Sequence, residues 1–149
     1  MTINIDTNVL VRAILADHPH ETAIAQQLLS QVAADKKFFI SSYAILEMVW
    51  VLKVKGKSQS QIIEVLLDFL DSPGVTIGQR EILVTAFEIY RQSKVDFGDC
   101  LILAEGGAYN THRLASFDKA LCKERNDYCQ HPEKFLKTHH KVCLDTEVS

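Results

Sequence analysis

Four acidic residues stand out by their surroundings in the sequence. Asp6 directly follows an apolar segment at the N-terminus, Glu47 interrupts a long apolar segment, Asp99 comes just before another, and Asp118 follows Leu114-Ala115-Ser116 closely. Carboxylate oxygens are the ligands that Mg²⁺ and Mn²⁺ prefer. Carboxylates that converge repel one another unless cations compensate them. If the fold brings these four acids together, the sequence predicts a site for a hard divalent cation.

Glu47 carries the strongest single signal. It separates Tyr43-Ala44-Ile45-Leu46 from Met48-Val49-Trp50-Val51-Leu52, and an unpaired charge buried in such a segment would be costly. Either a cation compensates the carboxylate, or Glu47 lies on a narrow solvent-exposed stripe that Lys53 and Lys55 share. Trp50, in the same apolar helix, is expected in the core.

The other three acids also have simpler interpretations. Asp6 could form an Asx turn after a strand, and Asp118 could cap a helix before Leu121. Asp96 is placed as the N-cap of a helix, which puts Asp99 inside its first turn. Each of these signals is weak alone, and their joint placement supports the metal site.

Short strands alternate with helices along the chain. Ile3 and Ile5 predict a strand ended by Asp6-Thr7-Asn8. Ser41-Ser42 could cap a helix that Gly56 ends, and Ser58 or Ser60 a helix that Pro73-Gly74 ends. The whole pattern predicts strands at 2–5, 37–40, 75–77 and 114–116, and helices at about 23–34, 43–55, 60–72, 81–92 and 97–108. A turn that includes His18 and His20 is expected at 17–20. A short helix is expected at 133–137.

This alternation predicts an α/β sandwich of three layers, with a central, mostly parallel sheet and helices on both faces. The 149 residues, 47% of them apolar, suffice for a single domain spanning residues 1–149. In a parallel sheet, ligands gather at the carboxyl ends of the strands. Asp6, Glu47, Asp99 and Asp118 all fall near that edge, so we expect them to converge.

Bulk properties restrict the function further. The net charge of −3 gives no global basic field, so a nucleic acid would have to meet a local patch or bound cations. Neither a signal peptide nor an apolar run of about 20 residues is evident, so a cytoplasmic protein without membrane contact is expected. Thiols without disulfides are expected for all the cysteines. A zinc site formed by Cys122, Cys129, His131 and Cys143 has suitable ligand types, but its spacing matches no structural zinc pattern.

The sequence resembles PIN domains and, more narrowly, the VapC-type toxins of bacterial toxin–antitoxin pairs. The resemblance runs from Thr2 to about Leu121, whereas the polar tail over residues 122–149 departs from the short C-terminal strand common in these toxins. It rests on Asp6-Thr7-Asn8-Val9-Leu10-Val11-Arg12, Glu47, Asp96-Phe97-Gly98-Asp99-Cys100-Leu101-Ile102-Leu103-Ala104 and Ser116-Phe117-Asp118.

The resemblance implies a ribonuclease that hydrolyses phosphodiester bonds with one or two Mg²⁺ or Mn²⁺ ions. Asp6, Glu47, Asp99 and Asp118 would be the catalytic metal ligands, Asn8 and Ser116 would orient them, and Asp96 would take part occasionally. A small antitoxin protein and a homodimer are implied in the same way.

RNA phosphates would contact cationic side chains near the site. The candidates are Arg12, Lys53, Lys55, Lys57 and Lys119, although any one of them could equally be a solvated surface residue.

Two other functions compete with the ribonuclease. A phosphatase with Asp6 as nucleophile would need a second acid where the chain has Asn8, and no lysine partner stands out. A non-catalytic PIN-like module could bind RNA or a protein, but clustered negative charge would not help it to bind RNA. No G-x-S-x-G motif or histidine beside a nucleophile indicates a catalytic triad.

Overall fold

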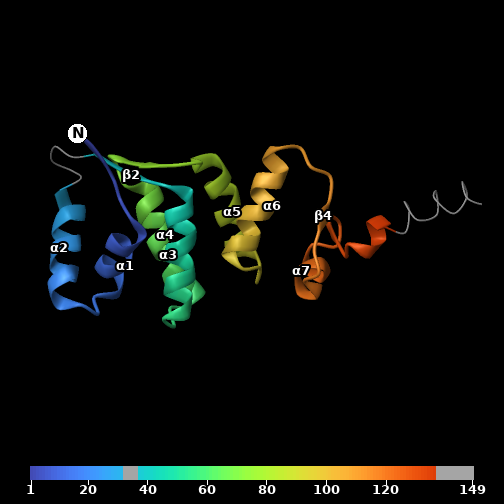
Figure 1. Ribbon diagram of the computed structural model, residues 1–149, viewed down its shortest axis with the longest axis horizontal. Coiled ribbons are helices and arrows are strands. Elements are labelled where there is room, and N and C mark those ends of the chain that lie inside the picture. The colour runs from blue at the N-terminus through green and yellow to red at the C-terminus, as the bar shows by residue number, and fades with distance from the viewer. Residues whose placement is uncertain (32–36, 137–149) are drawn as a thin grey trace, which may run out of the picture. The chain divides into compact units, whose positions relative to one another are not determined.

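A computed structural model describes residues 1–31 and 37–136, which form two compact units. The first is Met1–Leu101 and the second begins at Ile102, within helix α6. The single-domain organisation stays a prediction. In chain order, the first unit contains β1 (Thr2–Asn4), α1 (Thr7–Leu15), α2 (Pro19–Ser30), β2 (Lys37–Ile40), α3 (Ser42–Val54), α4 (Gln59–Asp71), β3 (Val75–Ile77), α5 (Arg80–Gln92) and the start of α6 (Phe97–Ala108) (Figure 1).

The first unit is built on a parallel three-stranded sheet in the order β1-β2-β3, which confirms the predicted α/β class. Phe38 in β2 lies opposite Ile3 on one side and Val75 on the other. The backbone amide of Ile5 donates to Phe39 O at 2.9 Å, so pairing extends to the residue before Asp6. The central strand is the most deeply buried of the three, because it is covered along both edges and its Phe38 and Ile40 lie in the core.

Side-chain caps start α3 and α4 where the sequence predicts them. The Ser41 hydroxyl accepts from the backbone amide of Ala44, and Ser58 forms a reciprocal capping box with Gln61. Gly56 follows α3 with a φ of +87°, a conformation that glycine adopts without steric cost. Of the two caps considered for α4, the structure selects Ser58.

Helix α1 has no counterpart in the sequence prediction. The Asp6 carboxylate accepts from the backbone amide of Thr7, so it caps a helix that starts at once, where a turn was expected. Leu10 is fully buried and anchors this short helix. Helix α2 likewise starts earlier than predicted, because His18 caps it and Pro19 occupies its first position. His20 is therefore helical, and its predicted place in a turn is wrong.

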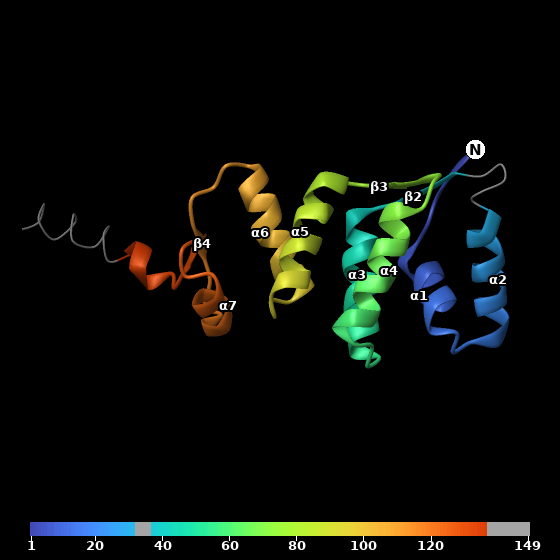
Figure 2. The ribbon, with the colours of Figure 1, turned by 180° about the vertical axis from the view of Figure 1, so that it is seen from behind.

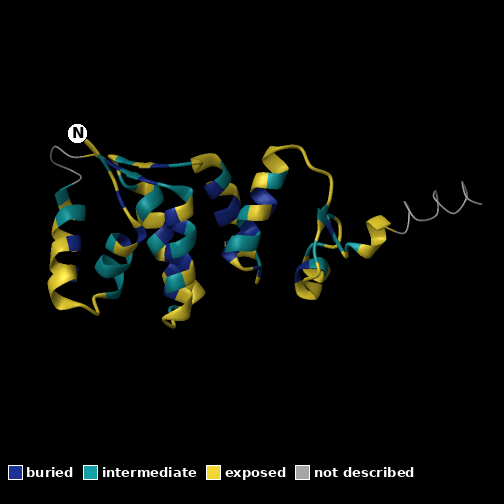
Figure 3. Ribbon diagram, in the orientation of Figure 1, coloured by how far each residue is buried: buried dark blue, intermediate teal, exposed yellow. Residues whose placement is uncertain are grey.

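The core of the first unit centres on α3. Helix α3 contacts α1 and α4, and α3 and α4 run side by side in both ribbon views (Figures 1 and 2). Met48 is buried, but Trp50 is 65% exposed, so the predicted core position of Trp50 is wrong. The colouring by burial in Figure 3 shows dark core positions along α3 beside exposed ones. Because α3 is apolar apart from Ser42, Glu47 and Lys53, its pattern marks the buried face only weakly.

The C-terminal part of the first unit is joined by an aromatic contact. Tyr90 of α5 and Phe97 of α6 meet edge to face, with ring centroids 5.5 Å apart. Tyr90 is buried, and Cys100, one turn into α6, is fully buried. This packing fixes the start of α6, which carries Asp99.

The second unit contains β4 (Leu114–Ala115), α7 (Lys119–Glu124) and β5 (Cys129–Gln130). Strands β4 and β5 pair in parallel, and Leu121 and Cys129 are buried between these elements. The sequence predicted β4 and the capping role of Asp118, but neither β5 nor the full α7. Residues 133–136 are helical, in line with the predicted short helix.

Within the described part of the chain, no helix combines the length and apolar character needed to cross a membrane.

Candidate active site

Five residues that the sequence predicts for the site line one pocket in the first unit: Asp6, Asn8, Arg12, Glu47 and Lys55. Helix α1 and its cap form one wall of this pocket, and α3 forms the other. The lining residues are Asp6, Thr7, Asn8, Val11, Arg12, Leu15, Asp17, Glu47, Val51 and Lys55. Residues far apart in the sequence therefore converge here, as expected.

The capping role of Asp6 positions it as a lining residue of the pocket. Its backbone is extended, with φ −75° and ψ 153°, and one carboxylate oxygen accepts from Thr7 N at 2.7 Å. A carboxylate offers about four lone-pair sites, so a cap uses only part of its capacity. Asn8, in the first turn of the same helix, adds an amide oxygen to the pocket.

Glu47 is half-buried on α3 and hydrogen-bonds the hydroxyl of Tyr43, one turn earlier. This hydrogen bond, followed by the charge of Glu47 itself, raises the pKa of Tyr43 above its ordinary value of 10.0. A tyrosine hydroxyl supplies a hydrogen bond but no positive charge. Of the two lysines considered as neighbours of Glu47, Lys55 lines the pocket and Lys53 pairs elsewhere.

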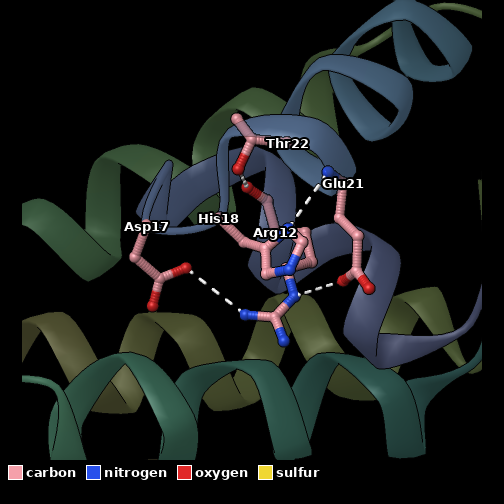
Figure 4. Close-up of polar contacts among 5 residues, drawn as sticks. All are labelled: Arg12, Asp17, His18, Glu21 and Thr22. Atoms are coloured by element: carbon pink, nitrogen blue, oxygen red, sulfur yellow. Dashed lines mark hydrogen bonds and ion pairs between the residues drawn. The ribbon is translucent and has the colours of Figure 1, made fainter.

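Arg12 lies on the pocket wall and is shared by two acids of the following segment (Figure 4). Its Nε donates to Glu21 at 2.7 Å and its Nη1 to Asp17 at 3.4 Å. The hydrogen bond with Glu21 is the main reason why the pKa of Arg12 is raised above its ordinary value. Thr22 donates to the backbone carbonyl of Arg12 at 3.0 Å, which ties α2 to α1.

The side chains lining the pocket carry more negative than positive charge. Asp6, Asp17 and Glu47 contribute three carboxylates, whereas Arg12 and Lys55 contribute two cations. The imbalance favours a small cation over an anion at this position. A phosphate group would therefore need the two basic side chains or a bound cation to approach.

The start of α6 lies against α3 in the first unit. A Cβ atom added to Gly98 would be 3.5 Å from Leu46 Cδ1, the residue before Glu47. Asp96 forms an ion pair with Lys53 of α3, and its backbone carbonyl accepts from Cys100 N at 2.9 Å, as an N-cap residue's does. Asp99 is half-buried in the first turn, and its charge also contributes to the raised pKa of Lys53, after that of Asp96.

Three further candidates, Ser116, Asp118 and Lys119, lie in the second unit. Asp118 caps α7, with its carboxylate accepting from Leu121 N at 3.0 Å. Ser116 Oγ accepts from Asp118 N at 3.0 Å, so the two predicted site residues support one another. Lys119 is the exposed first residue of α7. This network holds Asp118 at the end of β4, as predicted.

The family comparison bears on residues in both units. The model of the PIN domain family matches residues 3–125, which is most of the chain. The chain belongs to the PIN domain family. PIN domains are typically metal-dependent nucleases, so membership of the family indicates this general class of activity. No curated protein matches the chain.

The oxygen atoms at the pocket of this PIN domain are of the chemical types that bind a hard divalent cation. Asp6 and Glu47 offer carboxylate oxygens and Asn8 offers an amide oxygen, the ligand types that Mg²⁺ and Mn²⁺ accept. Over residues 1–31 and 37–136, no three acidic, histidine or cysteine side chains are close enough together to hold a metal ion. The role of the four acids as a common ligand set therefore stays a prediction.

The sequence analysis of this PIN domain missed Asp17, which lines the pocket, and Tyr43, the hydrogen-bond partner of Glu47. Asp17 was taken only as part of a turn, and Tyr43 only as an apolar neighbour of Glu47. Helical spacing of Leu10, Val11 and Ile14 would have revealed α1, the helix that carries Arg12. The i, i+4 spacing of Tyr43 and Glu47 would have revealed their contact.

Proposed function

We propose that this PIN domain is a divalent-metal-dependent ribonuclease, of the VapC kind, that acts as the toxin of a toxin–antitoxin pair. The observation that carries the proposal is the pocket lined by Asp6, Asn8 and Glu47 in a chain of a nuclease family. The family match spans both units, which supports one catalytic domain.

In this proposal, Asp6, Glu47, Asp99 and Asp118 hold one or two Mg²⁺ or Mn²⁺ ions. Such a metal, when bound, makes water a stronger nucleophile and stabilises the charge that grows on the phosphate oxygens. Asn8 and Ser116 orient the ligands, a role supported by the hydrogen bond between Ser116 and Asp118. Asp96 is tied to Lys53 and acts on the site through the start of α6.

The RNA backbone contacts Arg12 and Lys55, which already line the pocket. Lys119 follows Asp118 directly and adds a further phosphate contact. Lys53 contributes less than these three residues, because its ammonium group is engaged with Asp96. Asp17 and Glu21 hold the guanidinium of Arg12 in place before substrate arrives.

The partners follow from the resemblance to VapC-type toxins. We propose that a small antitoxin protein binds the chain, that the chain forms homodimers, and that it works in the cytoplasm. The pocket offers the antitoxin a cationic side chain, Arg12, among its lining residues.

Cleavage of RNA by the purified, antitoxin-free protein tests the activity. Total cellular RNA is incubated with wild type, Asp6→Asn and Asp99→Asn, in Mg²⁺, Mn²⁺ or chelator. The matched control Asp68→Asn removes an exposed carboxylate from α4, away from the pocket. We expect cleavage by wild type and control, and its loss in both site variants and in chelator.

Two outcomes would contradict the proposal. Cleavage that survives in chelator would exclude the metal mechanism. Specific binding of RNA without cleavage under either metal would favour the non-catalytic PIN-like module. Denatured DNA added in parallel distinguishes a ribonuclease from a general nuclease.

A further inference from the structure

Two cysteines of the second unit face one another across α7 and β5. The sulfur atoms of Cys122 and Cys129 lie 3.1 Å apart, in hydrogen-bonding contact and with no disulfide between them. Cys122 is half-buried at the helix, and Cys129 is 1% exposed on the strand. One thiol is therefore within reach of a reagent, and the other is sheltered behind it.

Backbone hydrogen bonds hold this pair together. Cys122 N donates to Asp118 O at 3.0 Å, which fixes it in the first turns of α7. Cys129 N donates to Arg125 O at 2.7 Å, and Arg125 N donates to Leu121 O at 2.9 Å. The chain thus folds back tightly between the two cysteines. Their sulfurs must approach by only about 1 Å to reach the ~2.05 Å of a disulfide bond.

We propose that Cys122 and Cys129 form a reversible disulfide by exchange with the disulfide of a low-molecular-weight thiol. The Cys122 thiolate attacks one sulfur of that disulfide, which forms a mixed disulfide and releases one small thiolate. The Cys129 thiolate then attacks the Cys122 sulfur and releases the second small thiolate. The two protein thiols are oxidised, the small disulfide is reduced to two thiols, and the two protons lost by the cysteines are taken up by them.

The exposure of each sulfur assigns these roles. Attack on an external disulfide needs access, which Cys122 has and Cys129 has not. Cys100 is fully buried in the first unit, so it should react only after unfolding. A metal site of the same two sulfurs is disfavoured, because no third ligand joins them among the residues described.

The bond would lock the segment that carries Asp118. Ser116 N donates to Gln130 O in β5, and Asp118 caps the helix that carries Cys122. A Cys122–Cys129 bond therefore closes a covalent ring next to this network. The inference does not depend on the proposed nuclease activity, because the exchange needs only the two thiols.

The test uses the full chain with Cys143→Ser, so that only Cys100, Cys122 and Cys129 can react. The reduced protein is incubated with oxidised glutathione at mildly alkaline pH, then quenched with acid and analysed by intact mass and peptide mapping. We expect loss of two titratable thiols, a mass decrease equal to two hydrogen atoms, and a peptide that links residues 122 and 129. Dithiothreitol should reverse all three changes.

Two variants make the inference falsifiable. In Cys129→Ser, the reaction should stop at a stable glutathione adduct on Cys122, whereas Cys122→Ser should gain neither bond nor adduct while folded. A stable adduct on Cys122 of the parent protein, without the internal bond, would overturn the proposal. A linkage that involves Cys100 would also overturn it. Peptide mapping of the parent protein decides the matter even if a variant fails to fold.

Discussion

Asp6 and Glu47 line the same pocket, although one caps the helix after the first strand and the other lies in the middle of α3. The parallel pairing of β1 with β2 brings the two helices together, because α1 and α3 follow these neighbouring strands. The sheet therefore brings both acids to one place, and capping also holds Asp6. Single substitutions can distinguish the capping role of Asp6 from a role in metal binding.

Asp6 should have two separable roles. Asp6→Asn keeps a good capping side chain, whereas Asp6→Ala removes it and should lower the free energy of unfolding by about 1 kcal/mol. Both variants should bind Mn²⁺ more weakly than wild type. Urea unfolding and calorimetric titration measure the two effects. Wild-type Mn²⁺ affinity in Asp6→Asn would remove Asp6 from the ligand set.

The pKa of Tyr43 reports the charge of Glu47. Glu47→Gln should lower the pKa of Tyr43 towards its ordinary value of 10.0, because the hydrogen bond to a carboxylate and the nearby negative charge both disappear. Phenolate absorbance followed against pH measures the shift, with Tyr43→Phe to identify the signal. Glu64→Gln, which changes an exposed acid on α4, is the matched control. An unchanged titration in Glu47→Gln would show that the two side chains do not interact in solution.

Tyr90 should make the protein less stable in alkali. Burial of its ring disfavours the phenolate and raises its pKa above the ordinary value of 10.0. The folded state therefore keeps the proton where the unfolded state loses it. The stability that protonated Tyr90 contributes is complete below the pKa that this tyrosine has in the unfolded chain, and it is lost as pH rises above that pKa.

Urea unfolding between about pH 8 and pH 11 tests this sign. Stability should fall more steeply for wild type than for Tyr90→Phe, which lacks the titrating group. Tyr109→Phe removes an exposed phenol and should follow wild type. Parallel curves for wild type and Tyr90→Phe would contradict the effect of burial.

Arg12 should contribute to RNA affinity through phosphate contact. In an Asp99→Asn background that prevents cleavage, Arg12→Gln should weaken RNA binding at every sequence. It should also reduce the slope of log affinity against log salt by about 0.7, the value for one phosphate of a single strand. Arg91→Gln removes another exposed, acid-paired guanidinium and serves as the control. Equal salt slopes for the two variants would exclude the contact.

Much of this fold could be predicted from sequence because its signals are local. The strands at 37–40 and 75–77 have the predicted bounds, and Ser41 and Gly56 border α3 as expected. The simpler interpretation of Asp6 was an Asx turn and not an N-cap, because both use the same side-chain-to-backbone hydrogen bond. Strand β5 has only two residues, too few to show a period.

The candidate site was predictable only where topology determines it. Asp6 and Glu47 follow neighbouring parallel strands, so their convergence could be expected. The contacts of Glu47 with Tyr43, and of Arg12 with Glu21, depend on the helical phase and on a helix that the sequence analysis missed. Trp50 was placed in the core because most of α3 is apolar, but it lies three residues after Glu47, on the helix face that also carries the exposed Tyr43 and Val54.

Calorimetric titration of Mn²⁺ into wild type, Asp6→Asn, Glu47→Gln and the double variant tests the central claim most directly. If both carboxylates bind one cation at the pocket, each single variant should weaken binding. The double variant should lose less than the sum of the two losses, because neighbouring ligands of one site are coupled. Glu47→Gln should meanwhile keep or gain stability, since it relieves repulsion with Asp6. Wild-type Mn²⁺ affinity in both single variants would contradict the account and move the metal centre away from this pocket.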